Sequence, residues 1–174
     1  MPQAVKLFAG LLFTSLDFLS QAKERLVKEF GLADKESEIL DFTFTGYYDE
    51  EMGAGIKRQF VSFTRLILPE QLPAIKLLTN EIEQDLALKG KRQVNIDPGY
   101  LSLAKVVLAT TKDYSHRLYL GQGIYGEVTL TYAKGKFNPF PWTYPDYQTQ
   151  AYRQFFEEIR EIYKKQLQEN LEHH

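Results

Sequence analysis

The stretch from Leu7 to Phe13 is nearly continuous in apolar residues, and it constrains the fold more than any other feature of the chain. Apolar and polar residues do not alternate in it, so it predicts a strand that is buried on both faces and central in its sheet. The run is far shorter than the roughly 20 apolar residues that span a membrane. No positively charged segment with a cleavage site precedes it, so we expect a cytoplasmic protein without a signal peptide and without membrane partners.

Two strand–helix–strand units are predicted around this run. In the first, the 7–13 strand leads into a helix, and a strand follows at 40–44. In the second, a strand at 60–68 leads into a helix, and an extended segment follows at 93–96. The apolar residues of the two helices recur every three or four positions: Leu19, Ala22, Leu26 and Phe30, then Ile75, Leu78, Ile82 and Leu86. Two such units predict an α+β fold, a ferredoxin-like sandwich with a βαββαβ core.

The rest of the chain predicts an extension of this core by a β-hairpin, an aromatic flap and a third helix. Asp97-Pro98-Gly99 is typical of a turn, and a long strand is predicted at 101–111. The flap is the proline-rich segment 137–147. We expect a single domain over residues 1–170, followed by a cloning scar and tag remnant at 171–174. The third helix has one apolar face, formed by Tyr152, Phe155, Phe156, Ile159 and Tyr163.

The composition excludes several classes of protein. The chain has no cysteine, which excludes disulfides, zinc fingers, iron–sulfur clusters and thiol catalysis. Lys and Arg total 21 and Asp and Glu total 23, so the net charge is −2 and gives no global attraction to nucleic acid or anionic membranes. Without the predicted tag remnant, His116 is the only histidine.

The densest polar cluster of the chain follows a predicted buried strand. Lys112 and Arg117 are suited to hold a phosphate or carboxylate group. His116 is a candidate general acid or base, with Asp113 or Glu127 to orient it. The alternative is an ordinary charged connection between strands.

The segment 121–128 has the pattern G-x-G-x-x-G-x-V. A dinucleotide-binding site would need this pattern to lead into a helix, but the following residues alternate as a strand. The segment therefore predicts a hairpin in which Leu118 pairs with Leu130 and Leu120 with Val128. Its glycines either supply positive φ angles to the turn or cradle an anion with their backbone; they are Gly121, Gly123 and Gly126.

Two further groups of oxygen-bearing side chains are candidates for a metal site. Asn95 and Asp97 lie on one side of a predicted strand end and could contribute to a Mg²⁺ or Ca²⁺ site, although Asp97 before a proline also favours a turn. The acidic loop Asp49–Gly55 could supply carboxylates, although such loops are usually solvated.

The aromatic flap is a candidate interaction surface. It could cover the sheet or form a homodimer contact. Its rings could stack bases, but the segment contains few cations, so we do not expect nucleic acid as a partner.

Several motifs together resemble a prokaryotic family catalogued as domain of unknown function 4416. The motifs are Tyr47–Gly53, Arg92–Tyr100, Leu108–Asp113, His116-Arg117, Gly123–Leu130 and Trp142–Asp146. Some members carry the label "GTP-binding protein", but this sequence has neither a Walker A motif nor N-K-x-D. The resemblance therefore implies membership of a family with no established activity. It also supports a shared site around Asn95, Asp97, Lys112, Asp113, His116, Arg117 and Glu127.

We expect the protein to bind a small anionic ligand, such as a nucleotide or phosphate ester, with Mg²⁺ as an associated ion. The alternative is a non-catalytic interaction or oligomerisation module that uses the aromatic flap and a face of the sheet.

Overall fold

The computed structural model describes residues 1–172 and shows an α+β protein with one nine-stranded antiparallel sheet and four α-helices. The strands are β1 Val5–Phe13, β2 Ala33–Glu36, β3 Leu40–Asp41, β4 Lys57–Ile67, β5 Val94–Leu101, β6 Lys105–Thr110, β7 Arg117–Gly121, β8 Ile124–Ala133 and β9 Lys136–Pro139. The helices are α1 Leu16–Phe30, α2 Asp49–Met52, α3 Leu72–Asp85 and α4 Gln150–Glu172, with short 3₁₀ turns η1 Pro69–Gln71 and η2 Pro145–Gln148.

The strand β1 lies inside the sheet, between β4 and β5. Every residue of β1 is buried, which confirms the prediction from its apolar run. The full order is β2-β4-β1-β5-β6-β8-β7, with β3 paired to β4 and β9 paired to β8.

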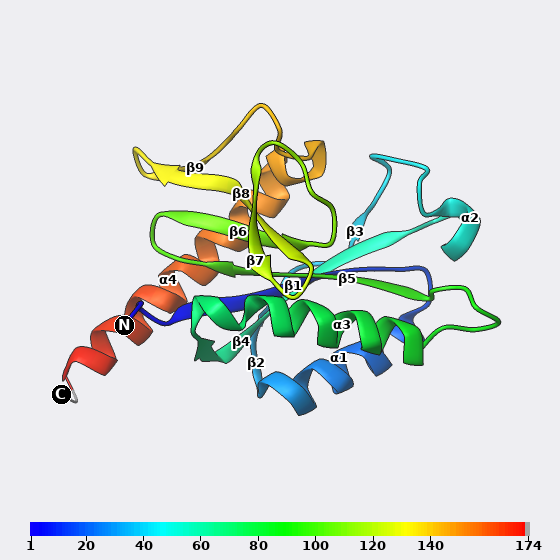
Figure 1. Ribbon diagram of the computed structural model, residues 1–174, viewed down its shortest axis with the longest axis horizontal. Helices are drawn as coiled ribbons and strands as arrows, with labels where there is room; N and C mark the ends of the chain where they lie inside the picture. The colour runs from blue at the N-terminus through cyan, green and yellow to red at the C-terminus, as the bar shows by residue number, and fades with distance from the viewer. Residues whose placement is uncertain (173–174) are drawn as a thin grey trace.

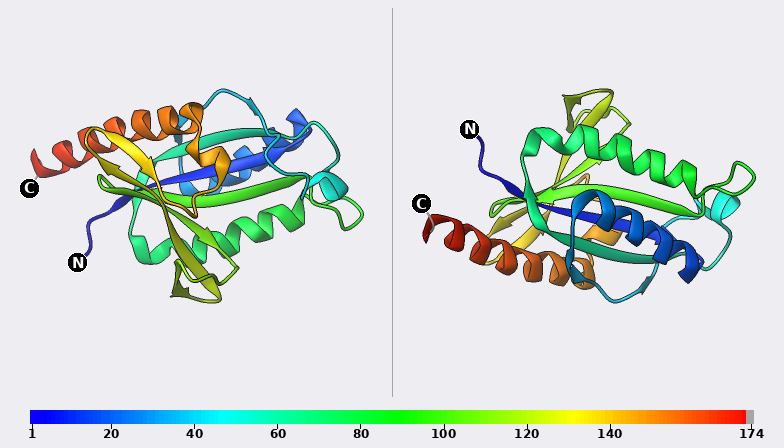
Figure 2. Two further views of the ribbon diagram at one scale, coloured as in Figure 1. Left: turned by 90° about the horizontal axis from the view of Figure 1, so that it is seen from above. Right: turned by 90° about the horizontal axis from the view of Figure 1, so that it is seen from below.

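Helices cover both faces of the sheet (Figures 1 and 2). On one face, α1 and α3 pack over alternate β1 residues such as Leu7 and Leu11, together with Leu26 and Ile82. On the opposite face, α4 packs over Phe8. The predicted apolar face of α4 is buried there as a whole: Tyr152, Phe155, Phe156, Ile159 and Tyr163. The central strand therefore has a layer of helix against each face, as its lack of polar alternation requires.

The predicted turn at Asp97-Pro98-Gly99 is wrong, because β5 runs straight through these residues. Backbone groups alternate in direction along a strand, so Pro98 faces the β6 side, as Ile96 does. Proline has no N–H to donate, and β5 pairs with β6 only from Gly99 to Leu101. The expected 101–111 strand is correspondingly shorter: residues 102–104 form a turn, and β6 begins at Lys105.

The region between α1 and β4 also differs from the prediction. Strand pairing with β4 uses Ala33–Glu36, while the expected strand at 40–44 is reduced to Leu40–Asp41. The residues of β2 have no apolar alternation that would mark them as a strand. The acidic loop contains the single turn of α2.

The β7–β8 hairpin is tighter than the predicted one. Leu118 lies opposite Gly126, and Gly121 lies opposite Ile124, so only Gln122 and Gly123 form the turn. Both turn residues have positive φ, 55° and 77°, which matches the right-handed twist of paired strands. Most of the expected loop is therefore strand.

The predicted tag remnant falls at the end of α4. Leu171 and Glu172 continue that helix, and residues 173–174 lie outside the described residues. Across residues 1–172, no helix combines the length and apolar character needed to cross a membrane.

Candidate functional site

β5 and β6 pair only from Gly99 to Leu101, and the first residues of β5 have no pairing with β6. We call this gap in the sheet the fork, and a cavity lies there. Its volume is about 1060 Å³. The walls come from the segment between β3 and α2, one face of α3, the start of β5, the end of β6, η2, and single residues of β4, β7 and β8. The sequence positions that line it run from Phe42 to Tyr147, so the cavity depends on the fold of most of the chain.

Where β6 no longer pairs with β5, two charged side chains of α3 form hydrogen bonds with the β5 backbone instead. Glu83 Oε1 accepts a hydrogen bond from the Ile96 backbone N–H at 2.7 Å, and Lys76 Nζ donates to the Ile96 carbonyl at 3.3 Å. The backbone N–H and carbonyl of Ile96 are therefore both hydrogen-bonded, although the β5–β6 pairing does not reach this residue. Burial raises the pKa of Glu83 to about 7.

Arg58 forms the floor of the cavity. Its side chain is 3% exposed. Nη1 donates to Asp97 Oδ2 at 3.2 Å, Nε donates to the Tyr152 hydroxyl at 3.1 Å, and Nη2 lies 3.6 Å from Asp146 Oδ2. Gly10 makes room for this group, because a Cβ there would lie 2.8 Å from Nη1. The guanidinium therefore occupies space that a β1 side chain would otherwise fill.

Tyr147 lines the cavity beside this floor and has a buried hydroxyl without a hydrogen-bond partner in residues 1–172. The residue is 2% exposed. Burial raises its pKa well above the usual value and also raises the pKa of Asp146, so removal from water dominates at both groups. A buried O–H without a partner costs about 1–3 kcal/mol, so this hydroxyl is a local cost to the stability of the fold.

Arg92 connects the acidic α2 segment to β5. It donates to Glu51 through Nε at 2.9 Å and Nη2 at 2.8 Å, and to Asn95 Oδ1 through Nη1 at 2.9 Å. This bidentate pair lowers the pKa of Glu51. The acidic loop and the Asn95–Asp97 pair thus meet in space, since Asn95 Nδ2 also donates to Asp97 Oδ2 at 3.0 Å.

Arg117 and Glu127 organise the opposite wall. Arg117 Nε donates to Glu127 Oε2 at 2.9 Å, and its other nitrogens donate to the Lys112 carbonyl at 3.1 Å and the Tyr144 hydroxyl at 2.9 Å. Glu127 Oε2 also lies 3.0 Å from His116 Nε2. The Arg117 guanidinium therefore has three protein partners. These partners hold it in place, so its role in the cavity wall is at least structural.

The structure brings half of the predicted site residues to this cavity: Asn95, Asp97, Lys112, Arg117 and Glu127. His116 reaches it only through Glu127, and its ring stacks on Trp142 at 5.3 Å between centroids. Asp113 is exposed and makes no hydrogen bond or ion pair within residues 1–172. Gly121, Gly123 and Gly126 do not line the cavity. Gly126 instead gives space to Leu120, which would lie 2.9 Å from an added Cβ.

Several cavity residues were not predicted as part of a ligand site, and three of them, Tyr144, Asp146 and Tyr147, belong to the predicted aromatic flap. The others are Tyr48, Arg58, Lys76, Glu83 and Arg92. Two sequence features, which the sequence analysis did not use, could have indicated part of this site. A glycine inside an apolar strand indicates a close approach, here of Arg58 to Gly10, and a proline inside a strand indicates an interrupted ladder, here at Pro98.

The proposed Mg²⁺ ligands are engaged by arginines. Asn95 accepts from Arg92, and Asp97 accepts from Arg58. Over residues 1–172, no group of three or more His, Cys, Asp or Glu side chains is placed to hold a metal ion. Asn95 and Asp97 alone would leave most of the coordination to water and ligand oxygens.

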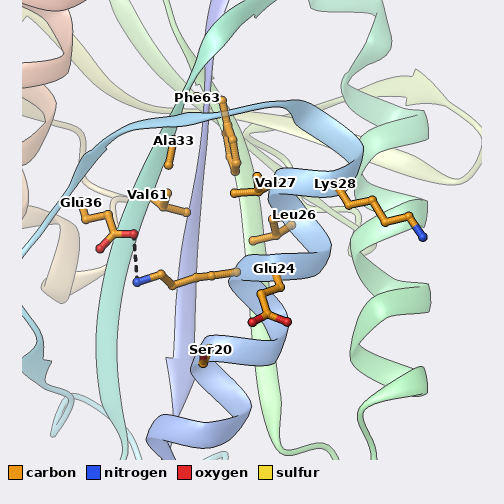
Figure 3. A pocket seen from close by; sticks show the side chains of 10 residues that line it. Ser20, Glu24, Leu26, Val27, Lys28, Ala33, Glu36, Val61 and Phe63 are labelled. Atoms are coloured by element: carbon orange, nitrogen blue, oxygen red, sulfur yellow. Dashed lines mark ion pairs between the residues drawn. The ribbon is translucent and has the colours of Figure 1, made fainter.

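A second hollow, of about 430 Å³, lies between α1 and the β2–β4 edge (Figure 3). Leu26, Val27, Val61 and Phe63 contribute much of its wall, and the ion pair between Lys23 and Glu36 measures 2.9 Å. It brings together no cluster of buried polar groups like that around Arg58, so the fork cavity is the candidate functional site.

The fold and this cavity define an antiparallel α+β protein with a polar site at a fork in its sheet. The family model described as "Domain of unknown function (DUF4416)" matches residues 3–163, and the chain belongs to this family. No curated protein and no solved structure matches the chain.

Proposed function

We propose that the fork cavity binds a small anionic ligand, such as a nucleotide or another phosphate ester. The observation that carries the proposal is a pair of lysines, Lys76 and Lys112, that line the cavity from different elements. Neither lysine has a carboxylate within 4 Å among residues 1–172, whereas Arg58, Arg92 and Arg117 do. Lys112 is therefore available to a ligand phosphate, and Lys76 adds positive charge to the wall, although it also donates to the Ile96 carbonyl and lies near Glu83.

The rest of the cavity supports the same class of ligand. Lys112 Nζ lies 5.2 Å from the centroid of the Tyr47 ring, which holds the ammonium group near the mouth. The aromatic rings in the wall can pack against a base or another flat group. They are Phe42, Phe44, Tyr47, Tyr48, Tyr144 and Tyr147. A volume of about 1060 Å³ is at the upper end of the range for small-molecule pockets.

The test is calorimetric titration of the protein with AMP, CMP, GMP, UMP and inorganic phosphate, each with and without Mg²⁺. Lys112→Glu should weaken binding at least tenfold, while Lys165→Glu on the exposed surface of α4 should not change it. The arms without Mg²⁺ measure whether the ion is part of the site. Failure of every probe to bind wild-type protein would refute an anion site.

We also infer a ferredoxin-like relationship for the core. The order β2-β4-β1-β5, with α1 and α3 on one face, is the strand order of a βαββαβ sandwich when β1, β2, β4 and β5 are taken as its four strands. The strands β6 to β9 and α4 would then be the extension. A solved structure of a family member is the check on this assignment.

A second candidate function, homodimerisation, is favoured by the exposed strand β7 at the sheet edge. Leu118 is 74% exposed and Tyr119 is 62% exposed. Unpaired edge strands with apolar side chains are sites of strand addition. Light scattering after size exclusion, compared between wild type and Leu118→Lys, is the test: a dimer that Leu118→Lys dissociates supports this function, and a wild-type monomer at all concentrations contradicts it.

A further inference from the structure

Two lysine side chains are buried within residues 1–172, and they differ in their partners. Lys6 forms an ion pair with Asp34 at the sheet. Lys76 on α3 is 8% exposed, forms no ion pair within the same residues, and donates one side-chain hydrogen bond, to the Ile96 carbonyl at 3.3 Å. Buried lysines are almost always paired with a carboxylate. Holding one carbonyl needs only an N–H donor, so the buried amine of Lys76 calls for another explanation.

The amine of Lys76 lies at the edge of the fork cavity. The carbonyl that Nζ contacts belongs to a part of β5 that has no pairing with β6. Lys76 itself lines the cavity, as do Asn95 and Asp97 on either side of Ile96. A ligand in the cavity therefore reaches this amine from the side that β6 leaves free.

Glu83 places a carboxyl group beside this amine. Its Oε1 accepts from the Ile96 N–H at 2.7 Å, so one residue of β5 holds both the carboxyl group and the amine. The nearest cation to Oε2 is Arg92, at 3.5 Å. Burial raises the pKa of Glu83 to about 7, so its carboxyl group both gives and accepts protons near neutral pH.

A buried amine next to a proton-exchanging carboxyl group is suited to imine formation. Lysines that react with carbonyl carbons are held in buried sites, where the neutral amine is the nucleophile. The nitrogen lone pair attacks the carbonyl carbon, and a C–N bond forms as the oxygen becomes a hydroxyl. Breaking of the C–O bond then releases water. The carboxyl group donates one proton to the departing oxygen and receives one from the nitrogen, so no oxidant or reductant is needed.

We infer that Lys76 forms an imine with an aldehyde or ketone bound in the fork cavity, and that Glu83 transfers the protons of this reaction. The inference rests on the proposed function, because Lys112 binds the anionic group of the same ligand. Lys76 reacts as the neutral amine, so the anionic group is left to Lys112. The substrate class is therefore a small carbonyl compound that carries a phosphate or another anionic group.

The experiment traps the imine with sodium borohydride, which reduces it to a stable secondary amine, and locates the label by peptide mass spectrometry. Glyceraldehyde 3-phosphate is the probe, and glyceraldehyde is the matched aldehyde without a phosphate. Lys165, exposed on α4, is the reference within the same molecule. We expect the probe to label Lys76 at least about tenfold faster than Lys165, because the cavity holds the carbonyl beside the amine. Equal or slower labelling of Lys76 would overturn the inference.

One variant tests the role of Glu83. Glu83→Gln keeps an acceptor for the Ile96 N–H but exchanges no proton, so labelling of Lys76 should slow at least about tenfold while labelling of Lys165 stays the same. Asp85→Asn, at an exposed pair between α3 and Arg25, is the matched control and should change neither rate. An unchanged rate at Lys76 in Glu83→Gln would remove Glu83 from the reaction.

Inorganic phosphate separates this inference from the proposed function. Both are supported if phosphate protects Lys76 and if glyceraldehyde 3-phosphate labels Lys76 faster than glyceraldehyde does. Equal labelling by the two aldehydes without protection by phosphate would support the imine and contradict the anion site. Calorimetric binding of nucleotides or phosphate without preferred labelling of Lys76 would overturn the imine while the anion site stands.

Discussion

At the scale of single residues, Tyr147 and Tyr163 offer a matched comparison of buried hydroxyls. Tyr163 donates to the Ala4 carbonyl at 2.7 Å, whereas the hydroxyl of Tyr147 has no partner within residues 1–172. We expect Tyr163→Phe to lower the free energy of unfolding by about 1 kcal/mol and Tyr147→Phe to leave it unchanged or raise it by a similar amount. Urea denaturation of both variants without ligand measures the difference, and equal losses would contradict the assignment of Tyr147 as unpartnered.

Glu83 should give the protein a measurable pH dependence. Burial raises its pKa from 4.5 to about 7 in the folded state, so between these values the native protein holds a proton that the unfolded chain has released. The contribution of Glu83 to the free energy of unfolding therefore falls as the pH rises from about 4.5 to 7, and levels off above that.

Glu83→Gln removes this contribution while it keeps an acceptor for the Ile96 N–H. The variant should be more stable than wild type at pH 8, and the two should converge toward pH 5. Chemical denaturation at a series of pH values is the measurement. Parallel profiles for the two proteins would show that Glu83 ionises normally in the fold.

At the scale of elements, Lys6 attaches α4 to the centre of the sheet. Its side chain is fully buried on β1 and donates to Asp34, to the Phe63 carbonyl and to Gln166 of α4. Burial lowers its pKa, although the hydrogen bond to Asp34 opposes this effect. Lys6→Met keeps an apolar stem but leaves Asp34 without its cation, so we expect a loss of about 3 kcal/mol.

Hydrogen exchange shows where that loss is felt. In Lys6→Met, the amides of the last turns of α4 should exchange faster than in wild type, while those of α1 should not. Lys165→Met on the exposed side of α4 serves as the control. If both variants were equally stable, Lys6 would have no such connecting role.

Elements with a strong apolar pattern could be predicted from the sequence, and elements defined by their partners could not. The continuous run of β1 and the helical spacing in α1, α3 and α4 each fix an element by local pattern alone. The strand β2 follows no pattern and exists because β4 offers it an edge. Pro98 favours a turn locally, but it lies in a strand because β5 pairs with β1. This pairing does not use the backbone nitrogen of Pro98, which faces the β6 side.

At the scale of the whole molecule, both helical layers share β1, so we expect them to unfold together as one domain. The single Trp142 makes this testable, because it stacks on Phe140, with 4.6 Å between ring centroids, and donates to the Val128 carbonyl of β8. Its fluorescence reports on the segment that packs against β8, and far-ultraviolet circular dichroism reports on all elements. The two thermal transitions should coincide. Separate midpoints would indicate two units.

The site could be predicted in part. The segments 95–97 and 112–127 were singled out because polar residues cluster in them, and the fold brings five of their residues to the cavity: Asn95, Asp97, Lys112, Arg117 and Glu127. Arg58 and Arg92 gave no comparable signal, since each acquires its role from side chains far away in sequence, such as Asp146 and Glu51. The glycines of the hairpin do not line the cavity: Gly121 and Gly123 have positive φ, and Gly126 gives space to Leu120.

The spread of the cavity along the chain has a consequence for the protein during its synthesis. The floor needs Arg58 from β4, Asp97 from β5, and Asp146 and Tyr147 from η2. While residues 146 and 147 are still inside the ribosome, a nascent chain lacks the η2 part of this floor. Under the proposed function, a ligand can therefore bind the complete floor only after nearly the whole chain has left the exit tunnel.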